Sequence, residues 1–485
     1  MKLKDIILPI AVEDVRGSLE KEIPALTSDS REVTPGALFI AVKGFASDGH
    51  AYIGQAISKG AAAILYEREG AVPEDLSGVT CIRVADSRLA VALAADAFYG
   101  HPSQKLTLVG ITGTNGKTTT VTLLYRMFLQ LGYNCGLLST IANYIGNERL
   151  ETANTTADPI TINSLLARMV AEGCSFCFME VSSIGMEQHR VSGLHFKVGI
   201  FSNLTHDHLD YHKTFAEYLR CKKLFFDSLP KDAFALINTD DRNGTVMVQN
   251  TKARVVTYAV RGLADHTARI LEQSFEGMLL RIDGQETWSR LIGEHNAYNL
   301  LAIYSTAVLL GTECTEALVA LSTLEPAPGR LENIRGPKDL SVVIDYAHTP
   351  DALENVLSTL RNIAPARKLV CLFGCGGDRD RTKRPEMAAV AERLADRIVL
   401  TSDTARTEDP EAILADIRAG LSPAGLGKTL TVTDRREAIR TAILTAEEGS
   451  TILLAGKGHE TYQIIGTAKR PFDEKAIVTE TFALL

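Results

Sequence analysis

A glycine-rich segment in the first third of the chain has the residue types that bind phosphate. It reads GITGTNGKTTT from Gly110 to Thr120, and an apolar stretch that begins at Leu106 leads into it. Apolar residues at helical spacing follow it, at Val121, Leu124, Phe128 and Leu131. Between a strand and a helix, backbone N–H groups hold phosphates, a lysine neutralises them and a threonine hydroxyl reaches Mg²⁺. The pattern predicts a nucleotide phosphate loop.

The expected nucleotide contacts of this loop are Gly113, Thr114, Asn115, Gly116, Lys117, Thr118 and Thr119. We expect Lys117 against the β- and γ-phosphates and Thr118 at the metal ion. The spacing departs from the strict P-loop, because Ile111 stands where that motif has its first glycine. A glycine-rich turn that only begins a helix is the alternative interpretation.

Two further segments carry side chains that could bind a metal ion. Glu180 ends the apolar run Phe176–Met179, and the segment from Asn203 to His212 reads NLTHDHLDYH. A carboxylate at the end of a strand beside a phosphate loop suits Mg²⁺, and a solvated strand-end acid is the alternative. Three histidines and two aspartates within seven residues also suggest a metal site. A metallohydrolase that uses His206, His208 and His212 is therefore a competing hypothesis.

The elements that must position these residues follow an α/β pattern. Apolar runs alternate with helical segments, which favours parallel sheets covered by helices on both faces. The strand-like runs of the C-terminal part are Ser341–Ile344, Leu369–Phe373, Arg397–Leu400 and Thr451–Leu454. With 485 residues, and with breaks near Tyr99–Gln104 and Glu325–Arg330, we expect three α/β domains, over residues 1–100, 101–333 and 334–485.

Composition excludes several classes of protein. A formal net charge of −8 argues against a general nucleic-acid binder, and no apolar run reaches the roughly 20 residues of a membrane helix. Eight cysteines over this length indicate reduced thiols in a cytoplasm, and a zinc site built on Cys174 and Cys177 is the less favoured alternative. We expect partners to be small molecules, with no nucleic acid, no membrane and a monomeric chain.

The segment GTNGKTT, together with NLTHDHLDYH and the sequence from Tyr218 to Lys222, resembles the Mur ligases and their folylpolyglutamate synthase relatives. The resemblance covers essentially the whole chain. It implies an ATP-dependent amide ligase with an N-terminal UDP-binding domain, a central P-loop ATPase-like sheet and a C-terminal Rossmann-like parallel sheet. It also implies that Lys222 is carbamylated. Cys221 stands where this family usually has alanine.

The resemblance assigns further residues to ATP, Mg²⁺ and catalysis. The implied magnesium ligands are Thr118, Glu180, His208 and Lys222 as a carbamate. The implied catalytic residues are Lys117, Glu180, His208, Lys222 and Arg330. Beyond the phosphate loop, the implied ATP contacts are His295, Asn296, Asn299, Arg330, Asp345 and His348.

The resemblance also implies two substrate sites. For a UDP-muramyl dipeptide the implied contacts are Ser30, Asn154, Thr155, Thr156, Ser182, Gln188 and Arg190. For an incoming amino acid, meso-diaminopimelate, they are Arg379, Asp403, Thr404, Ala405, Arg406, Gly456 and Glu460. Two arginines suit a distal carboxylate and a glutamate suits a distal ammonium. Because Thr404 and Ala405 replace the usual Asn and Pro, the LL isomer, L-lysine and other diamino acids remain alternatives.

Overall fold

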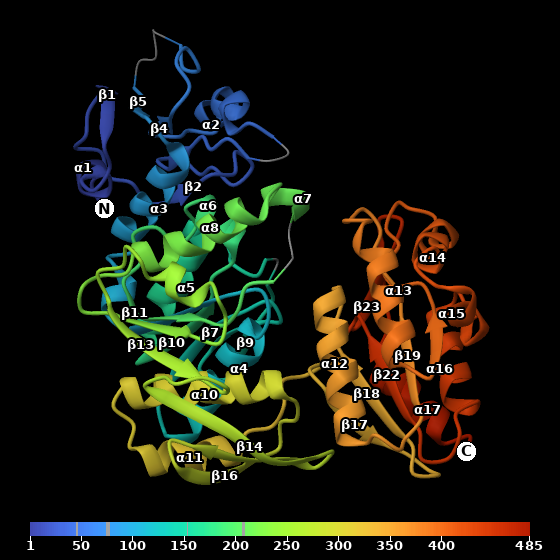
Figure 1. Ribbon diagram of the computed structural model, residues 1–485. Helices are drawn as coiled ribbons and strands as arrows, with labels where there is room; N and C mark the ends of the chain where they lie inside the picture. Colours follow the sequence, from blue (N-terminus) through green and yellow to red (C-terminus); the bar gives the residue numbers. More distant parts are fainter. Residues whose placement is uncertain (45–46, 74–77, 153, 206–208) are drawn as a thin grey trace.

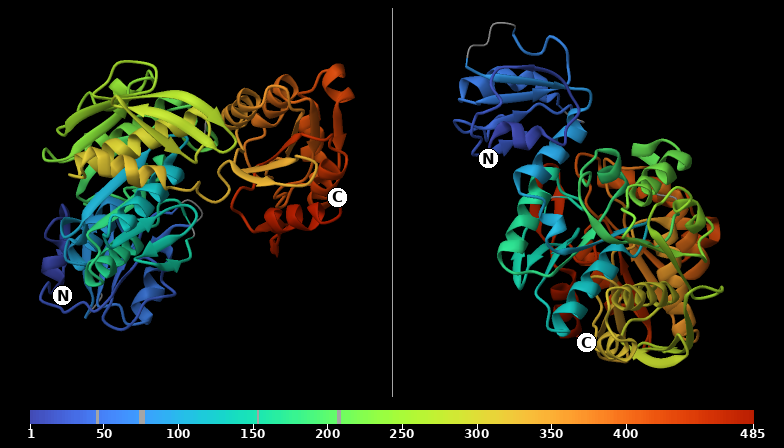
Figure 2. Two further views of the ribbon diagram at one scale, coloured as in Figure 1. Left: turned by 90° about the horizontal axis from the view of Figure 1, so that it is seen from below. Right: turned by 90° about the vertical axis from the view of Figure 1, so that its left-hand side faces the viewer.

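The computed structural model describes residues 1–44, 47–73, 78–152, 154–205 and 209–485. The described residues form three α/β parts, each built around a sheet of its own, with five, eleven and six strands (Figure 1). The predicted α/β class with a central phosphate-loop sheet and a C-terminal, mainly parallel sheet is confirmed. The N-terminal and C-terminal parts lie on different sides of the central part (Figures 1 and 2).

The N-terminal sheet has the strand order β1-β5-β4-β3-β2. Its strands are β1 (Val12–Arg16), β2 (Leu26–Thr27), β3 (Leu38–Ile40), β4 (Ala63–Tyr66) and β5 (Thr80–Val84), and its helices are α1 (Leu3–Ile7), α2 (Ile53–Ser58) and α3 (Ser87–Phe98). Alternate residues of β3 bury in different clusters, Leu38 and Ile40 in one and Phe39 in the other. Because side chains alternate across a strand, this sheet has a core on each face.

The central sheet has the order β16-β15-β14-β13-β12-β11-β6-β10-β7-β8-β9. Its strands are β6 (Thr107–Thr112), β7 (Cys135–Leu138), β8 (Asn143–Ile145), β9 (Glu148–Leu150), β10 (Phe176–Glu180), β11 (Phe196–Phe201), β12 (Phe234–Asn238), β13 (Arg254–Ala259), β14 (His266–Ser274), β15 (Gly277–Ile282) and β16 (Gln285–Ser289). Strands β7, β10, β6, β11, β12, β13 and β14 pair in parallel, and antiparallel hairpins extend both edges.

The central helices are α4 (Lys117–Gln130), α5 (Pro159–Ala171), α6 (Ser183–Glu187), α7 (Leu209–His212), α8 (Phe215–Asp227), α9 (Gly244–Met247), α10 (Glu294–Leu309) and α11 (Cys314–Ser322). Strand β6 lies between β10 and β11 and ends where the phosphate loop begins. Its Val109 and Ile111 bury with α4, whereas Leu108 buries in a second cluster on the other face. Burial on both faces fixes the direction in which the loop leaves the sheet.

The C-terminal sheet has the order β17-β18-β22-β19-β20-β21, and a separate hairpin joins β23 to β24. The strands are β17 (Glu332–Arg335), β18 (Ser341–Asp345), β19 (Leu369–Phe373), β20 (Arg397–Leu400), β21 (Thr429–Thr431), β22 (Thr451–Ala455), β23 (Tyr462–Ile465) and β24 (Ala468–Pro471). The helices are α12 (Pro350–Ile363), α13 (Lys383–Leu394), α14 (Pro410–Arg418), α15 (Pro423–Gly427), α16 (Arg435–Leu444) and α17 (Glu474–Phe482). Strand β17 runs antiparallel to β18, and the expected boundary after residue 333 falls within it. The domain boundaries stay predictions.

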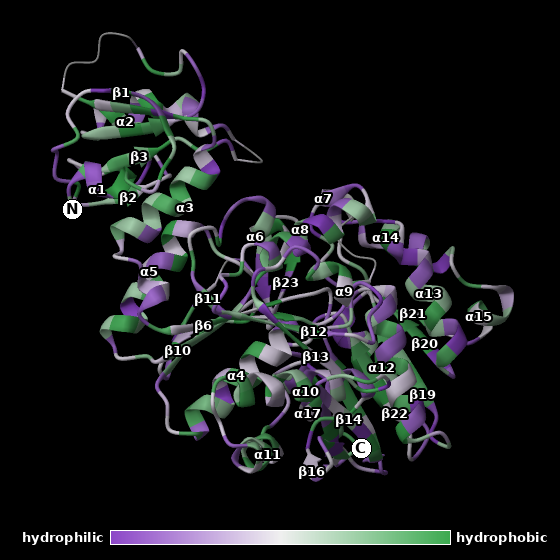
Figure 3. Ribbon diagram, turned by 60° about the vertical axis from the view of Figure 1, so that its left-hand side comes forward, coloured by the Kyte–Doolittle hydropathy of each residue, from purple (hydrophilic) through white to green (hydrophobic). Residues whose placement is uncertain are grey.

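Hydrophobic residues gather on the strands, and polar residues gather on the outward faces of the helices (Figure 3). All eight cysteines are free thiols, and seven of them are buried, as the sequence predicts. Among the described residues, no helix is long and apolar enough to cross a lipid bilayer.

Candidate functional site

The phosphate loop joins β6 to α4 through two glycines that no other residue could replace without strain. Gly113 has φ 152° and Gly116 has φ 87°. A Cβ atom on Gly113 would lie 1.9 Å from the Ser202 hydroxyl, and one on Gly116 would lie 2.4 Å from the Asn299 amide oxygen. The glycines therefore let the backbone pack closely and aim the start of α4 at the loop.

Two lysine side chains converge on one oxygen of this loop. The Lys117 ammonium donates to the carbonyls of Gly113, at 2.9 Å, and Thr114, at 2.8 Å. Lys222 on α8 is buried and donates to the same Gly113 carbonyl at 2.7 Å, with its Nζ 4.7 Å from the centre of the Tyr218 ring. Two cations in one low-dielectric site repel each other unless anions join them. The arrangement suits a bound phosphate and a carbamylated Lys222.

The segment after β11 holds the phosphate loop in place. The carbonyl of Asn203 accepts from the Thr114 N–H at 2.8 Å, and its side-chain oxygen accepts from the Asn115 N–H at 2.9 Å. The Thr114 hydroxyl is 3.1 Å from the Tyr218 hydroxyl on α8. The loop is thus bonded on both sides before any ligand binds, which is the rigidity that phosphate binding requires. Thr118 and Thr119 are buried at the start of α4.

Glu180 lies at the end of β10, beside Ile111 of the neighbouring strand β6. Its carboxylate is fully buried and accepts from Thr140, from the backbone N–H at 2.9 Å and from the hydroxyl at 3.2 Å. The Thr140 hydroxyl in turn lies 3.1 Å from that of Thr155. A buried carboxylate next to the phosphate loop, with lone pairs left after these bonds, suits a hard cation.

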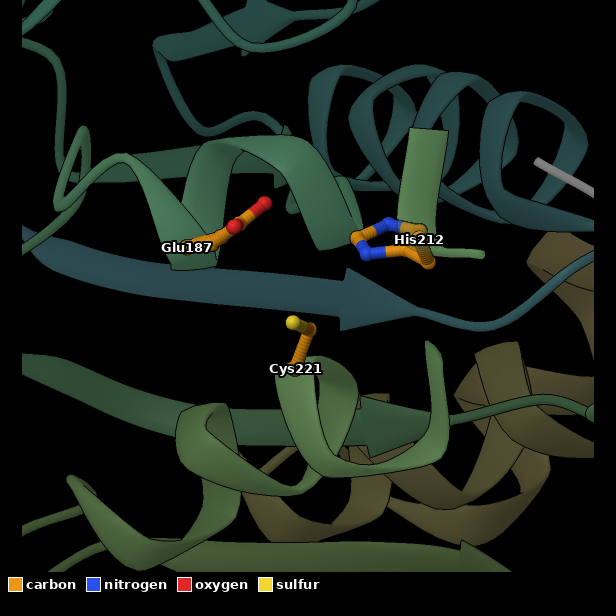
Figure 4. Close-up of side chains that lie close together, drawn as sticks. All are labelled: Glu187, His212 and Cys221. Atoms are coloured by element: carbon orange, nitrogen blue, oxygen red, sulfur yellow. The ribbon is translucent and has the colours of Figure 1, made fainter. Parts of the chain in front are cut away.

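The predicted residues His206 and His208 lie outside the described residues. His212 is buried, and its Nε2 lies 2.9 Å from the Ser183 hydroxyl. Figure 4 shows His212, Glu187 and Cys221 pointing toward one another from α7, α6 and α8, with ligand-type atoms within 4.8 Å of one another. Burial raises the pKa of the Cys221 thiol to about 11, so the thiol is protonated near neutrality. Glu187, His212 and Cys221 thus form a polar cluster between α6, α7 and α8.

The start of α10 packs on the phosphate loop. Asn296 donates to the Ile292 carbonyl at 2.8 Å, and Asn299 donates to Asn296 at 3.0 Å. Both asparagines are buried. His295 lies beside them, and burial together with the positive charge of Arg330 lowers its pKa to about 4. The helix therefore presents a neutral imidazole near Arg330 at physiological pH.

Arg330 lies in the crossing from the central to the C-terminal part. Its guanidinium is 4.8 Å from the centre of the Tyr346 ring, and that ring packs on His459 with centroids 5.1 Å apart. Asp345 is buried and accepts at 2.8 Å from the backbone N–H groups of Leu331 and Ala347. Asp345 thus fixes the backbone next to Arg330 and next to Tyr346, the ring that Arg330 contacts. His348 bonds to the Tyr346 carbonyl at 2.9 Å and lines a cavity of about 790 Å³.

Most of the residues implied for the UDP-muramyl dipeptide lie together in the central part, whereas one, Ser30, lies in the N-terminal part. Thr156 donates its hydroxyl to the Glu180 carbonyl at 2.9 Å, and its own carbonyl accepts from Arg190 at 2.6 Å. Arg190 also donates to the side-chain oxygen of Gln188 at 2.8 Å, and Ser182 caps α6. Helix α5 follows this group, begins at Pro159 and is capped by Asp158. Ser30, in the N-terminal part, donates to Gln55 at 2.8 Å.

A large cavity of about 1420 Å³ lies where the three parts meet. Its lining includes Arg88 from the N-terminal part, Asn154 and Thr155 from the central part, and Arg379 and Glu460 from the C-terminal part. The cavity of about 790 Å³ adjoins it, since Thr155, Tyr346, Arg379, Arg406 and others line both. Ligands bound in the three parts would therefore meet in one connected space.

The smaller cavity brings together most of the residues implied for the amino acid. Its lining includes Arg379, Asp403, Thr404, Arg406, Gly456 and Glu460. The Thr404 hydroxyl is buried and has no hydrogen-bond partner among the described residues. Ala405 differs, because its side chain packs in the hydrophobic core beneath. Arginines and carboxylates in one cavity suit a ligand that carries charges of both signs.

The sequence motifs did not identify two charged residues of the site. Asp351 on α12 accepts from the Asn115 side chain at 2.9 Å and from the Thr205 hydroxyl at 3.2 Å, so the C-terminal part touches the phosphate loop. Lys457 is buried under the smaller cavity, 3.3 Å from Asp403 and 3.2 Å from Glu460. Their places inside DYAHTPDAL and GKGHE were the available signals.

Three protein-family descriptions match the chain. They are "Mur ligase family, catalytic domain" over residues 22–99, "Mur ligase middle domain" over residues 111–307 and "Mur ligase, glutamate ligase domain" over residues 329–458. A relative from Bacteroides fragilis is 52% identical over 486 residues, 100% of both chains, and is named UDP-N-acetylmuramoyl-L-alanyl-D-glutamate–2,6-diaminopimelate ligase.

Solved structures give the same result for the fold. A structure with that same ligase name superposes with a TM-score of 0.71 at 31% identity and covers 100% of this chain and 99% of its own. The MurF ligase of Thermotoga maritima, solved in complex with ADP, superposes with a TM-score of 0.60 at 18% identity, over 94% of this chain and 96% of its own. The chain is 52% identical to the Bacteroides relative over its whole length, and a Mur ligase family description matches each of its three parts. The chain therefore belongs to the Mur ligase family.

Proposed function

We propose that the chain is an ATP-dependent ligase that joins 2,6-diaminopimelate to the D-glutamate of UDP-N-acetylmuramoyl-L-alanyl-D-glutamate. The observation that carries the proposal is the smaller cavity, in which Arg379 and Arg406 lie with Asp403 and Glu460. A diamino dicarboxylate offers a matching set of charges, and relatives along the whole chain have this activity in their names. The product would be a peptidoglycan precursor.

ATP would phosphorylate the γ-carboxylate of D-glutamate, which gives an acyl phosphate and ADP. An amine of diaminopimelate would then attack the acyl carbon, the new C–N bond would form and phosphate would leave. Lys117 and the backbone N–H groups around Gly116 would offset the charge of the phosphates. Arg330, which lies in the crossing between the parts, would assist this transfer after the domains close. The fold neighbour solved with ADP supports the use of ATP.

Mg²⁺ fits the donor set around the loop. The oxygen of Thr118, the buried carboxylate of Glu180 and a carbamate on Lys222 would hold it, together with His208. When bound, Mg²⁺ neutralises phosphate charge. Carbamylation would also remove one of the two cations that meet at the Gly113 carbonyl. The remaining ATP contacts would come from His295, Asn296, Asn299, Asp345 and His348.

The muramyl dipeptide would lie in the large cavity between the parts. Asn154 and Thr155 line it, and Thr156, Ser182, Gln188 and Arg190 form the bonded layer behind them. Ser30 would contact the uridine end. We favour meso-diaminopimelate as the amino acid, bound through Arg379, Thr404, Arg406, Gly456 and Glu460. Since the reaction consumes ATP, we expect the enzyme in the cytoplasm.

An ADP-release assay tests the proposal. Purified protein with ATP, Mg²⁺ and UDP-N-acetylmuramoyl-L-alanyl-D-glutamate is given meso-diaminopimelate, LL-diaminopimelate, L-lysine or L-ornithine in separate reactions. We expect turnover only when an amino acid is present and the highest kcat/KM with meso-diaminopimelate. Absence of turnover with all four amino acids would refute the function, and a preference for lysine would refute the assignment of the two arginines.

A further inference from the structure

A cluster of buried charges lies under the proposed diaminopimelate cavity. Lys457 is fully buried, with its ammonium 3.3 Å from Asp403 Oδ1 and 3.2 Å from Glu460 Oε2. Asp403 and Glu460 line the cavity, whereas Lys457 lies beneath them. The lysine therefore joins two carboxylates of the cavity floor from behind.

A second buried ion pair supports this floor. Arg435 on α16 is buried and pairs at 2.7 Å with Glu474, the first residue of α17, and it donates to the Ala455 carbonyl at 2.9 Å. Its positive charge also acts on Asp403. Asp403 and Glu460 line the cavity, whereas the buried Lys457 and Arg435 do not. Arg406, which also lines the cavity, is a further positive charge that acts on Glu460.

The contacts of Glu460 show what Lys457 contributes. Burial raises the pKa of Glu460, Lys457 opposes this rise, the neighbouring charge of Asp403 adds to it, and Arg406 also opposes it, more weakly than Lys457. Without the lysine, two carboxylates would face each other in a site of low dielectric, and one of them would take up a proton. A protonated carboxyl group attracts an ammonium ion much more weakly than a carboxylate does.

We propose that Lys457 is a positioning residue that sets selectivity for a diamino acid, because it keeps Asp403 and Glu460 ionised and side by side toward the distal ammonium of the substrate. The inference rests on the proposed function, since it needs an amino acid whose distal amine enters this cavity. Lys457 touches no substrate atom and acts only through the two carboxylates.

The test compares two amino acids that differ in one group. Diaminopimelate and 2-aminopimelate share both carboxylates and the reacting amine, but the second lacks the distal amine. We measure kcat and KM for both with wild-type protein, Lys457→Met and Lys457→Arg. For Lys457→Met we expect the preference for diaminopimelate to fall about tenfold or more, mainly through its KM, as when a charged partner of a polar substrate group is lost. Lys457→Arg keeps the charge and should retain most of the preference.

Two comparisons separate positioning from a general loss of structure. Glu460→Gln should reduce the same preference, and Lys457→Met added to Glu460→Gln should reduce it little further, because both act on one recognition step. The matched control is Lys428→Met, which removes a lysine bonded to the carbonyls of Glu392 and Ala395 elsewhere in the C-terminal part and should leave the preference unchanged. The KM for ATP and the melting temperature are recorded for every variant.

The outcomes distinguish a wrong proposed function from a wrong role for Lys457. If wild-type protein does not use diaminopimelate, the proposed function is wrong. If wild-type protein prefers diaminopimelate and Lys457→Met keeps both its KM and its preference, the role of Lys457 is wrong. Equal losses for both amino acids, together with a raised KM for ATP, would also overturn it in favour of a purely structural role. Should Lys457→Met fail to fold, Lys457→Gln replaces it under the same criteria.

Discussion

The Gly113 carbonyl, which accepts from both Lys117 and Lys222, defines the chemistry of the site at the scale of single residues. Lysines are usually solvated, whereas Lys222 is buried and aimed at the phosphate loop. Its neighbour Lys223 instead pairs with Asp227 at 2.6 Å on the same helix. The two adjacent lysines thus have different surroundings: Lys222 contacts the phosphate loop, and Lys223 does not. In the sequence, only the position relative to Tyr218 favours Lys222 over Lys223.

Lys222→Ala should lower kcat by on the order of 10²-fold or more, because a group that supports the metal and phosphate charges is lost. Added bicarbonate should not restore activity, since no amine remains to be carbamylated. Steady-state ADP release measures both effects. Lys223→Ala is the matched control and should stay within about twofold of wild type, as expected for a partly exposed ion pair. Near-normal rates for Lys222→Ala would show that the lysine is misassigned.

Thr404→Val should change stability and binding in opposite directions. The Thr404 hydroxyl is buried without a hydrogen-bond partner among the described residues, so its removal should stabilise the free enzyme by about 1 kcal/mol. Thr404 also lines the amino-acid cavity, and its substitution should raise the KM for diaminopimelate about 3–10-fold. Thermal unfolding and initial rates test the pair. A lower melting temperature with unchanged KM would contradict this account.

At the scale of elements, helix α12 links the C-terminal part to the phosphate loop. Asp351 in its first turn contacts Asn115 and Thr205 across a sequence separation of 236 and 146 residues. A carboxylate at a helix N-terminus is also favoured by the helix dipole. The helix start therefore serves both its own stability and the contact between two parts of the molecule.

Asp351→Ala should raise the KM for ATP about 3–10-fold and lower the unfolding free energy by about 1 kcal/mol, because the contacts to Asn115 and Thr205 are lost. The control is Glu411→Ala in the first turn of α14, which removes a first-turn acid bonded to Thr433 within the C-terminal part. That variant should leave the KM for ATP unchanged. If both variants changed it equally, the effect would come from general destabilisation.

Local signals were sufficient for many elements. The runs Leu369–Phe373 and Arg397–Leu400 match β19 and β20, because short apolar stretches between turn residues are typical of buried strands. The antiparallel hairpins at the sheet edges were not predicted, since their polar, half-exposed strands lack such runs. Lys457 was not predicted as a site residue for a different reason. Its partner Asp403 is 54 residues away in the sequence, and only the fold brings the two together.

At the scale of the whole molecule, the crossing at Arg330 is sensitive to acid. His295 in the central part and His459 in the C-terminal part both lie near Arg330, and burial with its positive charge lowers each pKa to about 4. Both histidines are neutral at pH 7. Protonating them would place three cations in one junction.

The monomeric state, like the domain boundaries, stays a prediction.

Because of these two histidines, stability should fall as the pH drops from about 6.5 toward 4. The unfolded state takes up protons near the usual histidine pKa while the folded state does not, so each histidine contributes at most about 1.4 kcal/mol per pH unit. Above pH 6.5 this dependence disappears. Thermal unfolding of wild type and of a His295→Asn/His459→Asn double variant measures it, with His195→Asn as a control at a half-exposed site. An equally steep decline in the double variant would contradict the assignment.

The floor of the amino-acid cavity has a consequence for ligand design. A volume of about 790 Å³ exceeds what a seven-carbon amino acid fills, so steric exclusion contributes little to the choice of ligand. Discrimination must come from the pattern of charge, because arginines and carboxylates both line the cavity. The cavity is therefore expected to select ligands that carry both positive and negative charges. Inhibitors that present charges of both signs at the spacing of diaminopimelate should outcompete larger, uncharged molecules that fill the space better.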